Sequence, residues 1–300
     1  MRKINGLLFY SNGRPPLLSL VVAIHTLLKV YKGRVHVVFG PITPRFIIRE
    51  IEEAAERLTC STVKRRYHDD TVFDGTKREW WEKPHIIRNE SPFTNTLYYD
   101  TDHLFRGEFD DSIFEEIESH KLVNPSVGHP RTEGKILRAI RNSGVWDATR
   151  LDQPIPKRWK RSNGGCIGVH KHGDTMDKLI HIMNIYLKSR VWRLYSNAEE
   201  LALGTMVNTG HGEQVSDKWS REPTKTACYR ERGIELEDGV NGVHYSGKSY
   251  RRCNAWAKAF VEACQQDFLG ISSHGEFFNV GHRWLESSVE RFLMREWECW

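Results

Sequence analysis

Cysteines in a metal-binding or redox spacing are absent from this sequence. Its six cysteines are scattered over 300 residues with no Cys-x-x-Cys pair, so neither a zinc finger nor a disulfide framework is indicated. They are interpreted as reduced, mostly buried thiols of a cytoplasmic protein. Long apolar runs are also missing, because the most apolar stretch, residues 17–28, contains His25 and is too short to span a bilayer. The N-terminus has no apolar segment followed by a cleavage site, so no secretory signal is expected.

A strong charge of one sign is lacking as well. The formal net charge is only +5, which suits a polyanionic ligand such as a nucleoside diphosphate but is too small to indicate a nucleic-acid-binding protein. No glycine-rich loop of the P-loop type occurs, and nothing resembles a Ser/His/Asp or Cys/His hydrolase signature. The composition, with 39% hydrophobic and 28% charged residues, is that of an ordinary globular protein.

Short apolar runs alternate with helical patterns through the first third of the chain. The expected strands are residues 7–10, 35–39 and 97–99, with a further strand beginning at 62–63. The expected helices are residues 17–31, 44–58 and 80–87. Such alternation predicts a mostly parallel sheet covered by helices on both faces. Ligands bind these sheets beyond the carboxyl ends of the strands, so the loops after Tyr10 and Tyr99 are candidates for one site.

The second half of the chain is less regular. Strands are expected at residues 164–169 and 239–245, and helices at residues 174–187, 198–207, 254–268 and 287–297. No internal repeat or low-complexity linker divides the sequence.

Asp100 and Asp102 stand one residue apart at the end of the apolar run Leu97-Tyr98-Tyr99. Alternation along a strand points both carboxylates the same way, so the two can reach one divalent cation. Hard cations such as Mn2+ or Mg2+ take oxygen ligands and often bridge protein carboxylates to substrate phosphates. An isolated Asp-x-Asp is more often a solvated turn, and it is the preceding strand that favours a cation site here.

Two neighbouring segments resemble a known family. They are Lys83-Pro84-His85-Ile86-Ile87 and Ser91-Pro92-Phe93-Thr94-Asn95-Thr96-Leu97-Tyr98-Tyr99-Asp100-Thr101-Asp102. Both are similar to the region around the DxD motif of GT-A-fold glycosyltransferases, in the group of glycogenin-like and bacterial lipopolysaccharide galactosyltransferases. The resemblance implies a nucleotide-diphospho-sugar transferase with a Rossmann-like three-layer α/β/α fold and a mostly parallel mixed sheet. It also implies that Asp100 and Asp102 coordinate Mn2+, or Mg2+, against the diphosphate of a UDP-sugar.

Three later segments agree with this family in order and spacing. They are Asn163-Gly164-Gly165-Cys166-Ile167-Gly168, Glu199-Glu200-Leu201-Ala202-Leu203 and Val243-His244-Tyr245-Ser246-Gly247-Lys248. By resemblance, Asn163, Gly164 and Gly165 line the sugar pocket. The same resemblance makes His244 a third metal ligand and assigns Gly247 and Lys248 to the segment that meets the diphosphate.

The acidic pair Glu199 and Glu200 is the candidate catalytic group, together with Asp102. By resemblance, the pair lies beside the anomeric carbon of the donor sugar. A carboxylate there stabilises an oxocarbenium-like transition state in a retaining enzyme, or acts as general base in an inverting one. The resemblance favours retention. The structural alternative is that a helix N-terminus attracts acidic residues through its dipole.

The remaining donor-binding candidates are Tyr10, Ser11, Asn12, Lys83 and Thr101. The first three follow the first strand, where the loop of the family holds uridine and a tyrosine ring can stack on the base. A plain turn explains them equally well. Lys83 lies in a matching segment, and Thr101 stands between the two aspartates.

The resemblance covers roughly residues 5 to 252. We therefore expect a GT-A catalytic domain over residues 1–252 and a C-terminal helical extension packed on it over residues 253–300. Two departures concern the donor sugar and the acceptor. Tyr250-Arg251-Arg252 stands where the family usually has Pro-Trp, and Glu-Glu stands where Asp-Gln is commoner.

The sequence therefore predicts a metal-dependent glycosyltransferase that moves a sugar from a nucleoside-diphosphate sugar to a glycan, lipid-linked or small-molecule acceptor. Lys157-Arg158-Trp159-Lys160-Arg161 interleaves cations with an aromatic ring, as nucleic-acid-binding surfaces do, so a modified base in DNA is an alternative acceptor. A nucleotidyltransferase of similar fold is a second alternative, although residues 11–16 only faintly resemble its glycine-rich loop. A non-catalytic sugar-nucleotide binder is a third, and the intact carboxylates argue against it.

Overall fold

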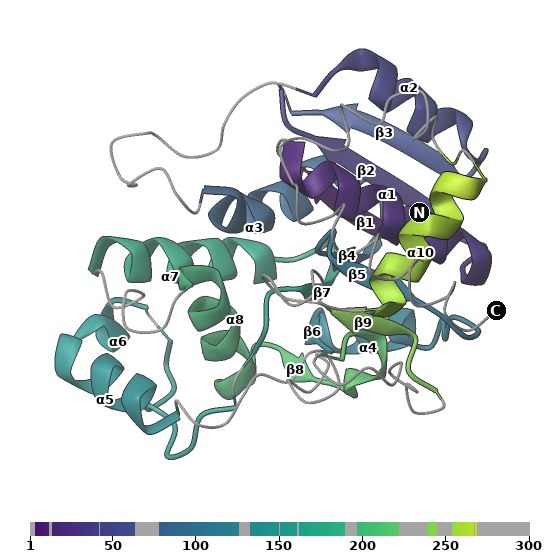
Figure 1. The fold of residues 1–300 in the computed structure, drawn as a ribbon. Coiled ribbons are helices and arrows are strands. Elements are labelled where there is room, and N and C mark those ends of the chain that lie inside the picture. Colours follow the sequence, from purple (N-terminus) through teal and green to yellow (C-terminus); the bar gives the residue numbers. More distant parts are fainter. Residues whose placement is uncertain are drawn as a thin grey trace. The chain divides into compact units, whose positions relative to one another are not determined.

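The computed structural model describes residues 4–11, 14–41, 43–63, 78–125, 133–149, 151–160, 162–189, 197–221, 239–244, 254–266 and 268 (Figure 1). The strands are β1 (Asn5–Ser11), β2 (Arg34–Phe39), β3 (Leu58–Thr62), β4 (Asn95–Tyr99), β5 (His103–Phe105), β6 (Leu122–Asn124), β7 (Cys166–His170), β8 (Glu213–Gln214) and β9 (Gly242–His244). The helices are α1 (Arg14–Val30), α2 (Arg45–Glu53), α3 (Arg78–Glu90), α4 (Ile113–His120), α5 (Glu133–Ser143), α6 (Val145–Ala148), α7 (Thr175–Ser189), α8 (Ala198–Asn208) and α10 (Asn254–Gln265), with a 3-10 turn at Asp217–Trp219.

Seven strands form one mixed sheet in the order β3-β2-β1-β4-β7-β6-β8, and β5 pairs with β9 in a separate two-stranded sheet. The pairs β2/β3 and β6/β8 are parallel, whereas β4/β7 and β6/β7 are antiparallel. The predicted mixed α/β sheet is confirmed. Cys60 of β3 and Cys166 of β7, the cysteines whose side chains are described, are both free thiols.

The chain divides into two compact units. Unit 1 comprises residues 1–8, 63–99 and 111–217, and unit 2 comprises residues 9–62, 100–110 and 218–300. Strand β1 begins in unit 1 and ends in unit 2. The predicted boundary between a catalytic domain at 1–252 and an extension at 253–300 stays a prediction.

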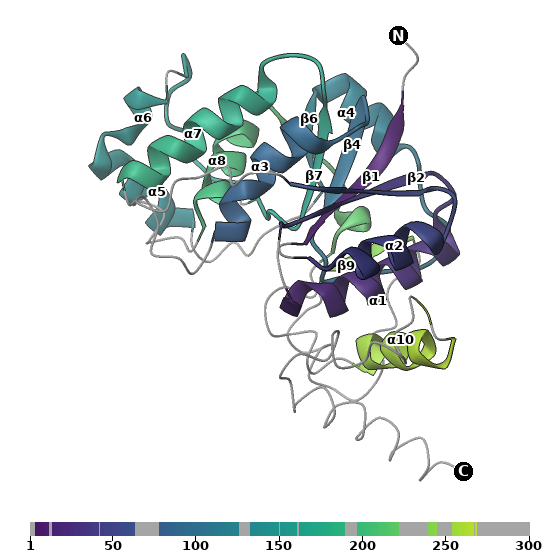
Figure 2. The same ribbon diagram turned by 90° about the horizontal axis from the view of Figure 1, so that it is seen from above.

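In unit 1, β4 is buried along its whole length and pairs antiparallel with β7, with Tyr99 opposite Cys166. A strand buried on both faces has a continuous apolar run, which explains why the sequence predicted it. Figure 2 shows α3, α7 and α8 grouped together, and these helices contact one another. The strand predicted over residues 164–169 begins later, at Cys166, because Gly164 and Gly165 form the turn that enters it.

In unit 2, β2 is the parallel neighbour of β3. Its β-branched sequence leaves every residue except Arg34 buried, as in a strand covered on both faces. The helix predicted over residues 44–58 is wrong in its last part, because α2 ends at Glu53 and Leu58 opens β3. Leu58 is paired with Val35 and is only 4% exposed. Its apolar side chain therefore belongs to the sheet core, although its spacing continues the apolar face of the helix.

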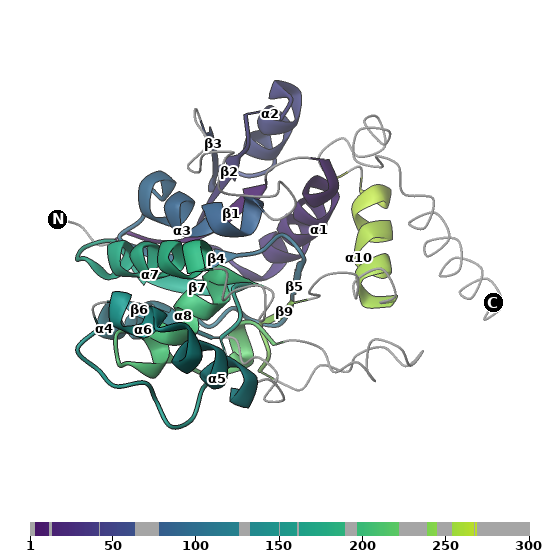
Figure 3. The ribbon, with the colours of Figure 1, turned by 90° about the vertical axis from the view of Figure 1, so that its left-hand side faces the viewer.

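Helices α1 and α10 pack against each other in unit 2, and Figure 3 shows α10 lying alongside α1. Lys29 Nζ and Glu262 Oε2 form an ion pair of 2.8 Å across this contact. The predicted helix over residues 254–268 ends at Gln265, and the helix predicted over 287–297 lies outside the described residues. None of the helices in the described part of the chain combines the length and apolar character needed to cross a membrane.

Candidate active site

The two aspartates that follow β4 belong to a short turn that leads into β5. Residues 100–102 form this turn, and β5 begins at His103. Strand β5 pairs antiparallel with β9, which places His103 opposite His244. The sequence predicted a strand around residues 239–245 but not its partner β5. The pairing of two segments far apart in the chain is therefore what brings His244 to the aspartates.

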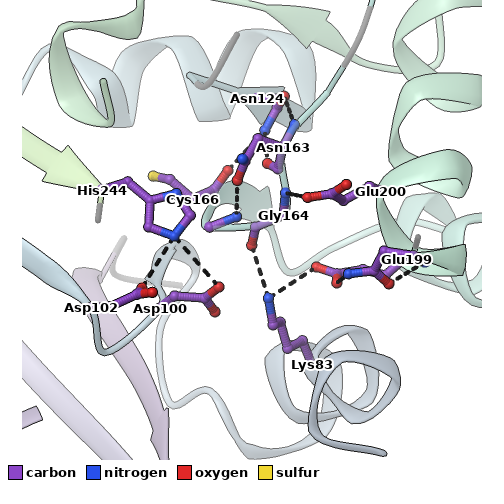
Figure 4. A network of polar contacts seen from close by, with 12 residues as sticks. Lys83, Asp100, Asp102, Asn124, Asn163, Gly164, Cys166, Glu199, Glu200 and His244 are labelled. Carbon is purple, nitrogen blue, oxygen red and sulfur yellow. Dashed lines mark hydrogen bonds and ion pairs between the residues drawn. The ribbon is translucent and has the colours of Figure 1, made fainter. Parts of the chain in front are cut away.

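The structure brings together the three residues proposed as metal ligands. His244 Nε2 lies 3.1 Å from Asp102 Oδ1 and 4.0 Å from Asp100 Oδ2 (Figure 4). The side chain of His244 is 4% exposed, whereas those of Asp100 and Asp102 are 21% and 19% exposed. A buried imidazole thus faces two carboxylate side chains that are partly exposed.

Three side chains at this place, one of them not among the predicted ligands, offer donor atoms that are close enough together for a divalent cation. Asp102, His103 and His244 offer ligand atoms that all lie within 4.8 Å of one another. In the described part of the chain Asp102 Oδ1 is buried and accepts no hydrogen bond, so it keeps lone pairs for a cation. Two carboxylates and one imidazole suit Mn2+, whereas structural zinc sites are built mainly from cysteine and histidine.

Sequence reasoning missed His103 and Ser220. His103 is completely buried, with its Nδ1 2.9 Å from the carbonyl oxygen of Asp100 and its Nε2 2.9 Å from Ser220 Oγ. Its ring stacks on that of His244, with 4.5 Å between the centroids and 4° between the planes. His103 could have been found from the sequence, because it directly follows the Asp-x-Asp motif. Ser220 could not, because it is distant in the chain and has no motif around it.

In unit 1 the acidic pair opens α8. Asn197 caps this helix, since its side-chain oxygen accepts a hydrogen bond of 3.2 Å from the Glu199 N–H. Glu199 is completely buried, and Lys83 Nζ from α3 lies 3.5 Å from its Oε1. Lys83 also donates to the carbonyl oxygen of Gly164 at 3.3 Å. The helix dipole alone does not account for Glu199, because the protein supplies this buried carboxylate with a counter-ion of its own.

Gly164 lies directly against the acidic pair. A Cβ atom at this position would collide with the carboxylate of Glu199, so the absence of a side chain at Gly164 permits this close approach. The N–H of Gly164 is 3.5 Å from Glu200 Oε1, and Glu200 is only half-buried (Figure 4). The backbone of one residue therefore faces Lys83 with its carbonyl oxygen and Glu200 with its N–H.

Asn124, which the sequence did not single out, holds the turn at residues 163–165. Its Nδ2 donates to the carbonyl oxygens of Asn163 and Cys166, both at 2.9 Å, and its Oδ1 accepts from the Asn163 N–H at 3.3 Å. Asn163 Oδ1 accepts in turn from the Gly165 N–H at 2.7 Å. Asn124 is completely buried, so these bonds satisfy an amide that would otherwise be costly in the interior.

The other donor-binding candidates have different outcomes. Tyr10 and Ser11 end β1 and are buried, with 7% and 0% exposure, and the carbonyl oxygen of Ser11 accepts from the Gly40 N–H at 2.9 Å. Thr101 is half-buried in the turn between the two aspartates. The candidates outside the described residues are Asn12, Gly247 and Lys248.

The basic segment at residues 157–161 does not present its aromatic ring to solvent. Trp159 is 4% exposed, and a Cβ at Gly204 of α8 would lie 3.0 Å from its ring. The exposed cations are Lys157, Arg158 and Lys160. The ring of Trp159 packs against α8, so the aromatic part of the segment behind the alternative DNA acceptor is not exposed to a ligand.

The strand order and the helices define an α/β protein of the GT-A class, and solved structures share this fold. Mouse xyloside xylosyltransferase 1, in its apo form, has a TM-score of 0.53 at 13% identity over 82% of this chain and 99% of that one. Galactosyltransferase LgtC, in complex with donor and acceptor sugar analogues, has a TM-score of 0.51 at 16% identity over 87% and 95%. The apo WbbM bifunctional glycosyltransferase has a TM-score of 0.51 at 6% identity over 87% of this chain and 50% of that one.

At these identities the likeness establishes the fold. The GT-A fold predicted from the sequence is thereby confirmed. No family model matches the sequence, and no curated protein matches it either.

Proposed function

We propose that this chain is a metal-dependent glycosyltransferase that moves a sugar from a nucleoside-diphosphate sugar, foremost a UDP-sugar, to an acceptor hydroxyl. The observation that carries the proposal is the meeting of Asp100, Asp102 and His244 beside the β5/β9 pair in a chain with the GT-A fold. Further support comes from the activities named for the fold neighbours, a xylosyltransferase and a galactosyltransferase bound to donor and acceptor sugar analogues.

Asp100, Asp102 and His244 would hold the cation, Mn2+ or Mg2+. When bound, a divalent cation neutralises the charge that develops on a departing diphosphate. The task of the three side chains is to keep their donor atoms aimed at one point. The partial exposure of the carboxylates leaves room for a diphosphate to approach, and the burial of His244 fixes its ring.

The acidic pair of unit 1 would act on the donor sugar. Glu199 is completely buried against Lys83, so its role would be structural: it packs against Gly164 and supports the turn at residues 163–165. Glu200 is more exposed and is the better candidate for the carboxylate beside the anomeric carbon. There it would stabilise positive charge on the sugar in a retaining transfer, the outcome that the family resemblance favours.

The acceptor is proposed to be a glycan, a lipid-linked sugar or a small-molecule hydroxyl in the cytoplasm. A modified base in DNA is a weaker candidate, because the burial of Trp159 removes the aromatic surface on which it depended. With a nucleoside-diphosphate sugar as donor, a nucleotidyltransferase would attack the α-phosphate and release the sugar 1-phosphate, whereas a glycosyltransferase releases the nucleoside diphosphate intact. The reaction product therefore separates these two activities.

A thermal-shift screen of UDP-, GDP-, CMP- and dTDP-sugars, each with and without MnCl2, tests the proposal. A ligand that binds only the folded chain raises the melting temperature with the logarithm of its saturation. We expect one group of donors, the UDP-sugars first, to raise it in the presence of Mn2+ and to release the nucleoside diphosphate slowly.

The variant D102A should lose the Mn2+-dependent part of this shift. D174A is the matched control, because Asp174 is a surface residue whose ion-pair partner is Lys178 in the same helix region, at 3.1 Å. A shift of equal size with and without Mn2+, or one retained in D102A, would exclude the proposed metal site. Release of sugar 1-phosphate in place of the nucleoside diphosphate would replace the proposed reaction by nucleotidyl transfer.

A further inference from the structure

His103 is held firmly in place directly beside the proposed metal ligands. It follows Asp102 directly, it is completely buried, and both of its ring nitrogens have partners. These partners are the carbonyl oxygen of Asp100 and the hydroxyl of Ser220, each at 2.9 Å. A buried imidazole that is held at both nitrogens keeps one orientation.

The partners of His103 define its tautomer. A carbonyl oxygen only accepts hydrogen bonds, so Nδ1 carries the proton that is donated to Asp100. In the neutral ring Nε2 is then an acceptor, and it accepts from the hydroxyl of Ser220, which is itself completely buried. Because both nitrogens are engaged, His103 is not placed as a metal ligand, although its ligand atoms lie close to those of Asp102 and His244.

Held in this way, His103 contacts or adjoins each of the three proposed ligands. Its bond to the Asp100 carbonyl closes the turn that carries both aspartates. Its ring lies parallel to that of His244, 4.5 Å away, and the register of β5 and β9 keeps the two residues opposite each other. A flat ring lying parallel to that of His244 hinders rotation of the His244 side chain, so its Nε2 stays close to Asp102 Oδ1, at 3.1 Å.

We propose that His103, supported by Ser220, is a positioning residue that orients His244 and the Asp100–Asp102 turn for a divalent cation. This inference rests on the proposed function, because it requires a cation at these three residues. Ligands that are already ordered lose less conformational freedom when they bind, so the consequence falls on metal affinity. Substitution of a residue that hydrogen-bonds to a metal ligand typically lowers metal affinity about 10- to 100-fold.

Three variants divide the role of His103 into its parts. H103F keeps a flat ring against His244 but loses both hydrogen bonds, and H103N keeps a donor towards Asp100 but loses the ring. S220A removes one hydroxyl and is the mildest change. The matched control is H36F, because His36 is another buried histidine of unit 2 whose two ring nitrogens are bonded, to Thr59 Oγ1 at 2.8 Å and Ser61 Oγ at 3.0 Å.

The measurement is the Mn2+ dissociation constant of the full chain, from the electron paramagnetic resonance signal of unbound Mn2+ during titration with MnCl2. We expect H103F and H103N to raise this constant about 10-fold or more. S220A should raise it about fivefold, the effect of one neutral hydrogen bond. H36F should bind Mn2+ like the native chain. Melting curves in metal-free buffer establish that each variant is folded.

Electron spin-echo spectra of bound Mn2+ separate positioning from direct ligation. One coordinated imidazole nitrogen, retained in H103F at saturating Mn2+, supports the positioning role. Two coordinated imidazoles in the native chain, with one lost in H103F, would overturn it and make His103 a ligand.

The same titration distinguishes failure of this inference from failure of the proposed function. If the native chain binds Mn2+, D102A loses it, and H103F, H103N and S220A bind with native affinity, the positioning role is overturned while the metal site stands. If the native chain binds no Mn2+, both are overturned.

Discussion

Two acidic groups, one in each unit, are stabilised in opposite ways. In unit 1, Glu199 is completely buried and receives its counter-ion from the protein, with Lys83 Nζ at 3.5 Å. In unit 2, Asp100 and Asp102 are 21% and 19% exposed and meet a single buried imidazole. A fully buried carboxylate needs a fixed counter-ion to offset its lost hydration, whereas partly exposed carboxylates can take a cation from solution.

This difference separates carboxylates that shape the structure from carboxylates that are open to a ligand. The counter-ion of Glu199 is part of the protein, so removing Lys83 should lower the free energy of unfolding. The counter-ion proposed for Asp100 and Asp102 is exchangeable, so removing either aspartate should lower the enzymatic activity. The predictions below test this distinction.

The largest effect is expected from D100A and D102A. Each should lower Mn2+-dependent turnover of the nucleotide-sugar by about 10³-fold, equivalent to about 4 kcal/mol of transition-state stabilisation. Their stability in metal-free buffer should be native or slightly higher, because one of two neighbouring like charges is removed. Initial rates over a range of MnCl2 concentrations measure the first effect and urea unfolding the second. Full activity of both variants in excess chelator would show that no metal acts here.

K83M should produce the opposite result. It leaves the carboxylate of Glu199 buried without its cation, so the free energy of unfolding should fall by about 3 kcal/mol. The double variant K83M/E199Q should recover part of this loss, because no buried charge remains. Urea unfolding, followed by tryptophan fluorescence, measures the free energy of unfolding of the native chain, K83M and K83M/E199Q.

The control for K83M is K178M, which breaks the exposed pair of Lys178 with Asp174 and should leave the free energy of unfolding close to its native value. Equal losses in K83M and in K83M/E199Q would contradict a stabilising pair. Rescue of K83M by MnCl2 alone would also contradict the distinction between the two groups.

G164A tests how tightly the unit 1 group is packed. The added methyl would collide with the carboxylate of Glu199, so we expect a loss of about 1 to 3 kcal/mol in unfolding free energy, the usual range for overpacking. G134A is the control, because a Cβ at Gly134 of α5 meets nothing within 4 Å. Alanine should stabilise that helix by up to about 1 kcal/mol. Native stability of G164A would mean that Glu199 can move away.

The smallest effect concerns His25, a buried group of unit 2 beside a like charge. Burial lowers the pKa of His25, the cation of Lys29 lowers it further, and Glu262 opposes the shift. The unfolded chain therefore takes up a proton more readily, so stability is full above pH 6.5 or so and is lost as the pH falls below it. H25L should make the free energy of unfolding, measured by urea, fall less between pH 7 and pH 5 than it does in the native chain. An unchanged pH profile would show that His25 does not contribute.

Local patterns predicted the elements whose burial is continuous along the chain. The run that ends at Tyr99 is buried at every position of β4, so composition alone indicated a strand. The end of α2 was mispredicted, because Leu58 continues the helical spacing while its burial comes from pairing with β2. Spacing along the sequence cannot distinguish these two sources of burial.

The sequence by itself determined the two carboxylates at the end of a buried strand, since alternation and adjacency depend only on neighbouring residues. It also indicated, through resemblance, that His244 belongs with them. Only the tertiary structure decided that His103 is bonded to Ser220 and stacks on His244, that Lys83 lies against Glu199, and that Asn124 holds the turn beside Glu199. The physical reason is that each of these contacts joins segments far apart in the chain, which only strand pairing and helix packing bring together.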